Sequence, residues 1–113
     1  MTTQLDVARG IGMMGSEASL RSILKTVETS LVSSLPDIGQ ALAVDDVKTV
    51  NRLLHSIKGY APIFCTEALA AHIAQVEGAS KTETAAVLRP LVAALLPQLA
   101  LLLTEISAFI ALG

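Results

Sequence analysis

Aliphatic residues recur at helical spacing along most of this chain, and that pattern limits the folds open to it. Residues three or four apart lie on one face of an α-helix, because the helix turns once about every 3.6 residues. Only 3% of the 113 residues are aromatic and none is Trp, so the core has to be built from Leu, Ala, Val and Ile. Such a core suits helices packed on helices, and the sequence predicts an all-α bundle in a single domain, residues 1–113.

The first half of the chain is expected to form three helices. Residues 1–15 carry a weak apolar pattern that ends in a Gly and Met cluster, which predicts a short extra N-terminal helix and a turn. Ser16 is a suitable N-cap for a first long helix, whose apolar stripe continues past Pro36 with a kink. The pair Asp45–Asp46 supplies a cap for the next helix, and Pro62 is expected to disturb its end.

Two more helices are expected in the second half. Cys65 or Thr66 can cap the first of them, and Glu77–Gly78 is expected to close it. The run Ser80–Glu83 reads Ser-Lys-Thr-Glu and matches the capping box, in which the serine and glutamate side chains satisfy backbone N–H groups reciprocally. This run is therefore expected to open the last helix, which continues towards Leu112.

The last helix carries apolar residues over more of its surface than one core contact requires. Its longest uncharged run, residues 90–104, contains Pro97. The run falls short of the roughly 20 apolar residues that span a bilayer, so a buried helix is expected rather than direct membrane insertion. Surplus apolar surface usually marks a contact, and the candidate partners are the N-terminal segment, a second copy of the chain or a larger protein. Self-association through this helix is one expectation.

Charge and cysteine content exclude some classes of partner. Eight Lys and Arg against ten Asp and Glu leave a net charge of −2, which supplies no basic field for a nucleic acid. The lone Cys65 has no partner for an internal disulfide, and the N-terminus lacks the basic start and apolar run of a signal peptide. These features indicate a reducing, cytoplasmic setting.

His55 is expected on the solvent face of the helix that follows Asp46. At about 100° per residue, it lies roughly 140° from the centre of the apolar stripe. Its neighbours one turn away on that face are four residues: Asn51, Arg52, Lys58 and Gly59. An exposed imidazole beside two cations suits a nucleophile that receives an anionic group such as a phosphoryl group. The alternative is a solvated surface histidine with ordinary neighbours.

The five residues His55–Gly59 read His-Ser-Ile-Lys-Gly and resemble the HxxKG signature of histidine-containing phosphotransfer (Hpt) domains. Hpt domains are the intermediates of multistep two-component phosphorelays. The resemblance covers residues 16–110. It includes the Asp45–Asp46 turn, the pair Leu53–Leu54 before the histidine, and residues 67–77 after it.

The resemblance implies an antiparallel four-helix bundle in which His55 is phosphorylated and exchanges its phosphoryl group with receiver-domain aspartates. Lys58 matches the family's phosphate-stabilising cation, and Gly59 matches the small residue that lets the receiver approach. The residues themselves suit these roles, since they place a positive charge one turn from the imidazole and a missing side chain beside it. The sequence departs from the family at Tyr60, commonly a small polar residue, and at Cys65, commonly a glycine.

The expected function is that of a phosphocarrier without kinase activity. Asn51, Arg52 and Pro62 are the candidate binding residues around the site. The partners implied are receiver domains of response regulators or of a hybrid sensor kinase, and the receiver would supply Mg²⁺ while this chain has no cofactor of its own. No Gly-rich phosphate loop or nucleotide motif is present. Both a free-standing carrier and the terminal domain of a hybrid histidine kinase fit the sequence.

Three other interpretations were weighed. The main alternative is a helical module for docking or oligomerisation that transfers no phosphoryl group. His72 is expected to be a half-buried histidine with a hydrogen bond rather than a second phosphoacceptor, because apolar residues surround it on its helix. A metal site built from His55, Cys65 and His72 fails on spacing, so no metal is expected.

Overall fold

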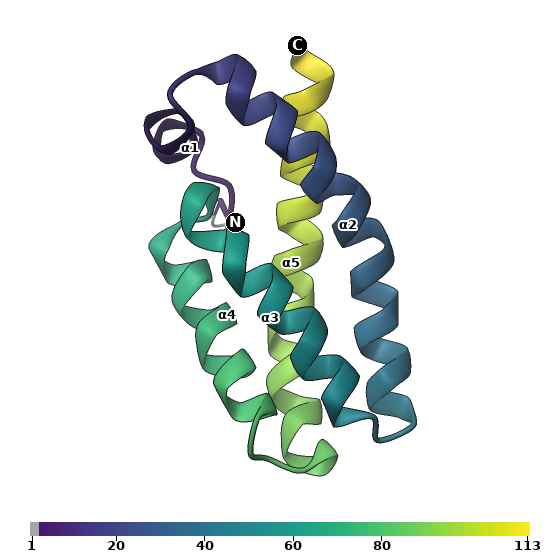
Figure 1. The fold of residues 1–113 in the computed structure, drawn as a ribbon. Coiled ribbons are helices and arrows are strands. Elements are labelled where there is room, and N and C mark those ends of the chain that lie inside the picture. Colours follow the sequence, from purple (N-terminus) through teal and green to yellow (C-terminus); the bar gives the residue numbers. More distant parts are fainter. Residues whose placement is uncertain (1–2) are drawn as a thin grey trace.

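Helices make up nearly all of the structure, a computed structural model that describes residues 3–113. Residues 1 and 2, which belong to the predicted lead-in segment, lie outside the described residues. The described helices are α1 Val7–Met14, α2 Glu17–Ala43, α3 Val47–Phe64, α4 Glu67–Ser80 and α5 Ala85–Leu112 (Figure 1). The all-α prediction is confirmed.

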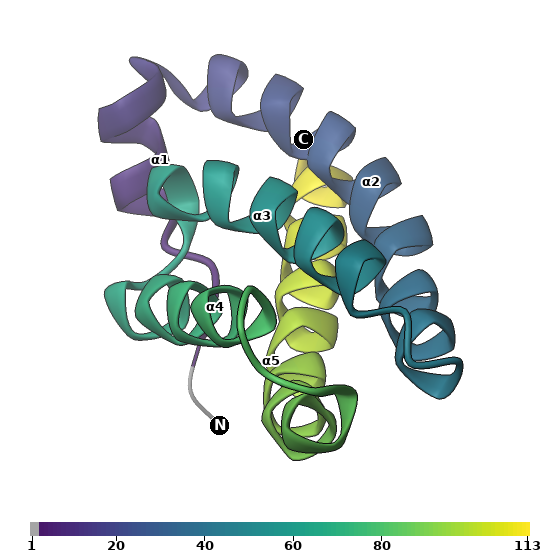
Figure 2. The same cartoon turned by 60° about the horizontal axis from the view of Figure 1, so that its bottom comes forward.

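Helices α2 to α5 form an antiparallel bundle, because short turns send each helix back along the one before it (Figure 1). Helix α3 lies between α2 and α4, and α5 closes the ring by packing against α2 and α4 (Figure 2). Helix α1 packs on α3 and α2 at the end of the bundle where α3 finishes. The architecture is the expected four-helix bundle with a short extra N-terminal helix.

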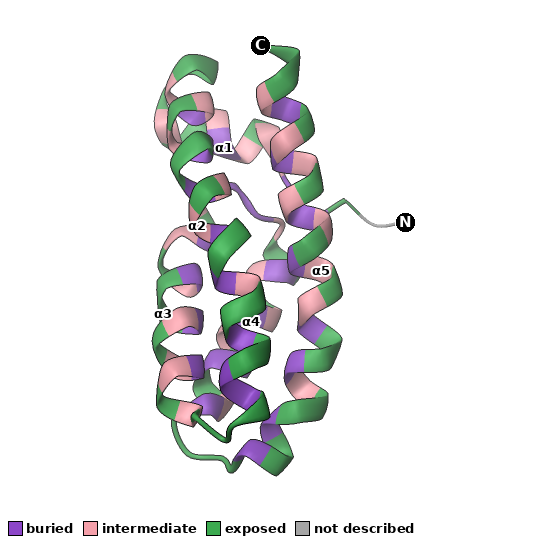
Figure 3. Ribbon diagram, turned by 90° about the vertical axis from the view of Figure 1, so that its right-hand side faces the viewer, coloured by how far each residue is buried: buried purple, intermediate pink, exposed green. Residues whose placement is uncertain are grey.

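The core is aliphatic, as the composition requires. Along the long helices, buried positions alternate with exposed ones at helical spacing (Figure 3). The largest fully buried side chains are Phe64, Leu20, Leu24, Leu31, Ile38, Leu54, Ile57, Leu69, Ile73, Leu88, Leu95 and Leu99. Burying one such side chain stabilises a fold by about 1.5–3 kcal/mol, so these residues fix how each helix is rotated about its axis.

By length and composition alone, α5 is the one helix of the described chain that could cross a membrane. One face of α5 packs in the core, where Val92, Leu99 and Ile106 are at most 1% exposed. Its exposed face consists largely of small residues and proline, among them Ala93 and Pro97. Core helices of bundles have the same length and composition, so this property is weak support for a membrane span.

The four prolines lie inside helices and leave them continuous. Pro36 stands within α2, as expected, and Pro90 and Pro97 stand within α5. Pro62 does not end its helix, since α3 continues to Phe64. All four prolines are exposed, so the carbonyl groups four residues earlier, which lose their N–H partner, face the solvent side and can bond water.

The predicted start of the last helix is wrong. Helix α4 continues past Glu77–Gly78 to Ser80, and α5 begins only at Ala85 with Thr84 as its N-cap. The Ser80 hydroxyl is buried and donates to the carbonyl oxygen of Glu77 at 2.6 Å. A hydroxyl committed to its own helix has no capping role in the next one, so the capping box does not form.

Residues 4–6 tie the N-terminal segment to the far side of the chain. They run antiparallel to residues 64–66, with an isolated β-bridge between Leu5 and Cys65. The backbone N–H groups of residues 4 and 5 both donate to Glu105 Oε1 on α5, at 2.8 and 3.1 Å. Leu5 is 6% exposed, so this segment covers part of the apolar surface where the α3–α4 turn meets α5.

Candidate functional site

The start of α3 is fixed by the turn that precedes it. Asp46 is its N-cap: Thr49 N–H donates to Asp46 Oδ1 at 3.2 Å and Thr49 Oγ1 donates to Oδ2 at 2.7 Å. These two hydrogen bonds hold the pKa of the Asp46 carboxyl below its usual value. Asp45 takes the left-handed conformation, φ 58°, and is paired with Arg89 of α5. The register of α3 is therefore set by Asp46, as predicted.

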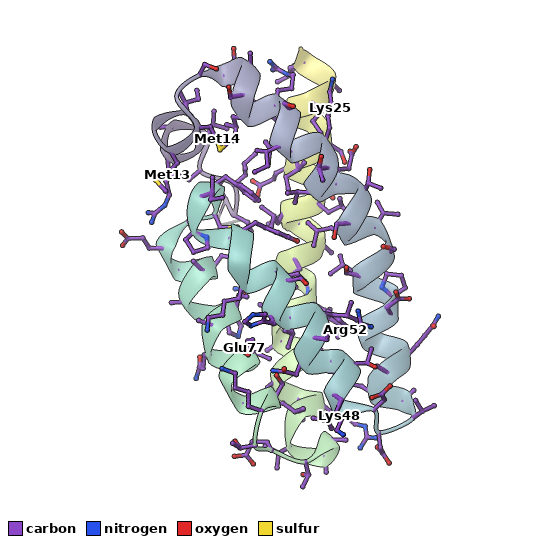
Figure 4. The ribbon with its side chains drawn as sticks, viewed as in Figure 1. Met13, Met14, Lys25, Lys48, Arg52 and Glu77 are labelled. Atoms are coloured by element: carbon purple, nitrogen blue, oxygen red, sulfur yellow. The ribbon has the colours of Figure 1, made fainter. Side chains whose placement is uncertain are left out.

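His55 lies on the exposed face of α3. Its predecessor Leu54 is fully buried and Ile57 is 1% exposed, and these two anchors turn His55 away from the core. Arg52 is exposed, and Lys58 is half-buried on the following turn. Figure 4 shows Arg52 and Lys48 on the half of α3 nearer the α2–α3 turn. The predicted exposure of the imidazole is confirmed.

Gly59 is not required by packing within the chain. It is exposed, and a Cβ atom built on it would meet nothing within 4 Å. Glycine in a helix interior costs about 1 kcal/mol relative to alanine, so an alanine here would fit and stabilise α3. Any requirement for glycine at this position therefore has to come from a molecule outside the chain. Pro62 is also exposed, and its carbonyl oxygen accepts from Arg9 Nε of α1 at 2.9 Å.

Asn51 differs from the other predicted site residues, because its amide is used between helices. Asn51 Nδ2 lies 3.0 Å from Glu77 Oε2 and 2.8 Å from Ser80 Oγ, both on α4. The residue is half-buried. Asn51 thus joins the middle of the bundle to α3 and holds the two helices in register.

Glu77 is the site residue that sequence reasoning missed. Its side chain is 0% exposed, and Lys58 Nζ donates to its Oε1 at 3.1 Å. Lys81 Nζ lies 3.5 Å from the same oxygen. Figure 4 shows Glu77 on α4, on the side towards α3. The signal was present, since Glu77 stands four residues after Ile73 and so lies on the buried stripe of α4.

The Glu77 carboxylate is stabilised as an anion in spite of its burial. Burial alone raises the pKa of a carboxyl group. The hydrogen bonds from Lys58 and Asn51, together with the charges of Lys58 and Lys81, outweigh that effect and lower the pKa of Glu77 below its usual value of 4.5. The lysine proposed to act on a phosphoryl group is therefore held in place by a buried negative charge.

This lowered pKa makes part of the stability depend on pH. The anionic carboxylate favours the folded state above about pH 4.5, and its contribution is lost as the pH falls through the lower folded-state pKa. Glu77→Gln has no such dependence at this position. We therefore expect wild type to exceed the variant in urea midpoint by the largest margin at pH 7, and the two midpoints to approach each other by pH 3.

Glu83→Gln, an exposed carboxyl in the α4–α5 turn, is the matched control for that comparison. It should follow the wild-type pH dependence. A constant difference between wild type and Glu77→Gln from pH 7 to pH 3 would show that the ion pairs of Glu77 add no pH-dependent stability.

The two positions that depart from the family are both turned inward. Tyr60 is half-buried and stacks on Phe64, with ring centroids 5.6 Å apart. Cys65 is 0% exposed, and burial raises the pKa of its thiol to about 12. A thiol with that pKa stays protonated near neutral pH and is a poor nucleophile. Cys65 serves instead as a core residue at the bridge to Leu5.

His72 has the surroundings that its sequence position predicts. It is half-buried on α4, and its Nδ1 lies 2.5 Å from Gln98 Oε1 of α5. Within residues 3–113, no group of three or more His, Cys, Asp or Glu side chains is arranged to hold a metal ion.

A family model settles the relationship to known proteins. The model of the Hpt domain matches residues 22–109, which is well over half of the chain. The chain belongs to the Hpt domain family. Hpt domains are helical bundles that act as phosphocarriers in phosphorelays, where they interact with receiver domains. The match includes all of α3 and α4, so it contains His55, Lys58 and Glu77, whereas α1 lies before it. Searches of curated proteins and of solved structures gave no match.

Proposed function

We propose that this Hpt domain carries a phosphoryl group on His55, which it accepts from the aspartate of one receiver domain and passes to the aspartate of another. The observation that carries the proposal is the register of α3. It exposes His55 while placing Lys58 one helical turn further on and an open glycine position, Gly59, beside it. The family gives the class of reaction, and this face of α3 offers the group to perform it.

The chemical step needs only a nucleophilic nitrogen and a leaving carboxylate. The lone pair of one imidazole nitrogen attacks phosphorus, and the P–O bond to the receiver's aspartate breaks as the P–N bond forms. The second ring nitrogen keeps its proton, so the phosphoimidazole bears a positive charge on the ring and the aspartate leaves as a carboxylate. Transfer onward is the same step in reverse with a second receiver.

Division of labour follows from what each partner contributes. A receiver would supply Mg²⁺ and most of the electrostatic stabilisation of the phosphoryl group, and the Hpt domain needs no cofactor of its own. Arg52, Gly59 and Pro62 are exposed around His55 and suit a docking rim, whereas Asn51 supports the site from within the bundle. The proposed setting is the cytoplasm, where receivers and their kinases act.

Lys58→Ala is expected to slow phosphoryl transfer to His55 by roughly tenfold to a hundredfold, the usual effect of losing one charged hydrogen-bond donor to a developing anion. Lys58 is 41% exposed at its side chain, so the helical circular dichroism should stay unchanged. Rapid-quench transfer from a phosphorylated receiver measures the effect. Rates equal to wild type would assign Lys58 a purely structural role.

The function is tested by incubating the protein with a panel of phosphorylated receiver domains. The expected result is phosphate on this chain that is labile in acid and stable in alkali, located by mass spectrometry on the peptide that contains His55. Failure to take up phosphate from every receiver would overturn the proposal, as would label on the His72 peptide alone. Receiver binding without transfer would instead identify a docking module.

A further inference from the structure

Two lysines share one oxygen of the buried Glu77 carboxylate. Lys58 Nζ of α3 lies 3.1 Å from Oε1, and Lys81 Nζ of α4 lies 3.5 Å from the same atom. The carboxylate is 0% exposed, while the two lysine side chains are 41% and 55% exposed. The second oxygen, Oε2, accepts from Asn51. Both cations therefore reach in from solvent towards one charge that cannot leave the interior.

Phosphorylation of His55 would give Lys58 a competing partner. Lys58 lies one turn from the imidazole, and a phosphoryl group there carries two negative charges for which an ammonium is well suited. If Lys58 moves to the phosphoryl oxygens, Glu77 loses its shorter ion pair. A buried carboxylate left without a cation is costly, so the bound lysine would be held back unless another charge took its place.

Lys81 is the residue in position to take that place. It stands four residues after Glu77 on the same helix, and its ammonium is already within ion-pair distance of Oε1. We propose that Lys81 is a positioning residue for the phosphotransfer site: it neutralises Glu77 when Lys58 turns to the phosphoryl group on His55. This inference rests on the proposed function, because it assigns the control of Lys58 within that same site.

Charge counting supports a site with two lysines. Before transfer, Glu77 and the two lysines together carry one net positive charge on the face next to His55. Once Lys58 binds the phosphoryl group, Lys81 and Glu77 remain as a neutral pair, so no uncompensated negative charge faces the new phosphate. With Lys81 removed, Lys58 would have to serve two anions at once.

The test measures phosphorylation of His55 by phosphoramidate, a small donor that removes receiver docking from the result. The imidazole nitrogen attacks phosphorus, and the P–N bond to ammonia breaks as ammonia leaves with a proton. We expect Lys81→Gln to lower the rate of phosphorylation and the lifetime of phosphohistidine by about threefold to fivefold, the range for an ion pair that is partly exposed. Lys81→Arg should restore both.

The deciding comparison is the same substitution in a Glu77→Gln background. A neutral glutamine needs no compensating charge, so Lys81→Gln should have no effect there. An equal loss in both backgrounds would mean that Lys81 acts on the phosphate directly and would overturn the inference. Lys25→Gln, which removes a lysine at the opposite end of α2, controls for net charge and should match wild type (Figure 4).

Two outcomes separate this inference from the proposed function. If wild type takes no phosphate on His55 from receivers or from phosphoramidate, the proposed function fails, and this inference with it. If wild type is labelled and Lys81→Gln behaves identically, only the inference fails. Thermal melts followed by circular dichroism, together with the NMR titration of the Glu77 carboxyl, provide readouts independent of transfer: the pKa of Glu77 should rise in Lys81→Gln.

Discussion

His55→Gln is expected to reduce phosphoryl acceptance from receivers to background while leaving the bundle folded. Glutamine has a polar side chain of similar reach, but its amide nitrogen has no lone pair available for attack on phosphorus. His55 is exposed and makes no contact on which the core depends, so the melting temperature should change little. The effect on transfer should exceed that of any other single substitution in the chain.

Transfer to His55→Gln is measured as acid-labile phosphate in parallel with His72→Gln. His72→Gln removes the second histidine, which is half-buried beside Gln98, and it should retain transfer. Substantial labelling of His55→Gln would place the acceptor elsewhere in the chain. Loss of labelling in His72→Gln with the fold intact would implicate the α4–α5 side of the bundle.

Gly59→Leu is expected to make the domain more stable and a weaker partner for receivers. Replacing glycine in a helix interior with a strong helix former gains up to about 1 kcal/mol, and no neighbouring atom opposes a Cβ here. The same side chain would project next to His55, where the proposed docking needs close approach. A clash of this size should raise the dissociation constant for a receiver about tenfold or more, which is at least 1.4 kcal/mol.

Gly39→Leu is the matched control, because Gly39 is also exposed inside a helix with nothing within 4 Å of its missing Cβ. Both variants should unfold at higher urea concentrations than wild type. Only Gly59→Leu should lose receiver affinity in isothermal titration calorimetry. An unchanged affinity in that variant would remove Gly59 from the docking surface.

Most of the fold could be read from local patterns. The caps at Ser16 and Asp46 and the apolar stripes predict α2 and α3 with their correct buried faces, because side-chain spacing alone decides which positions share a face. The exposure of His55 follows from the same argument, since it depends only on the register of one helix. Local sequence therefore accounts for the part of the site that α3 provides.

The errors lie where contacts between helices override local signals. Ser80 has the sequence of an N-cap, but its hydroxyl is drawn into a buried cluster with Asn51 of α3 and the Glu77 carbonyl, and α4 extends to include it. The role of Glu77 was missed for the same reason. Its partners Lys58 and Asn51 are 19 and 26 residues away, and no spacing rule within one helix connects them.

The bonds from residues 4 and 5 to Glu105 have a consequence for synthesis of the chain. Glu105 Oε1 is the acceptor for two backbone N–H groups about 100 positions earlier. During translation, helices α2 to α4 are complete before that carboxylate leaves the ribosome, and the N-terminal segment has to wait for it. Closing so long a loop costs entropy that only a preassembled bundle can offset. The first residues made are thus among the last to find their native partners.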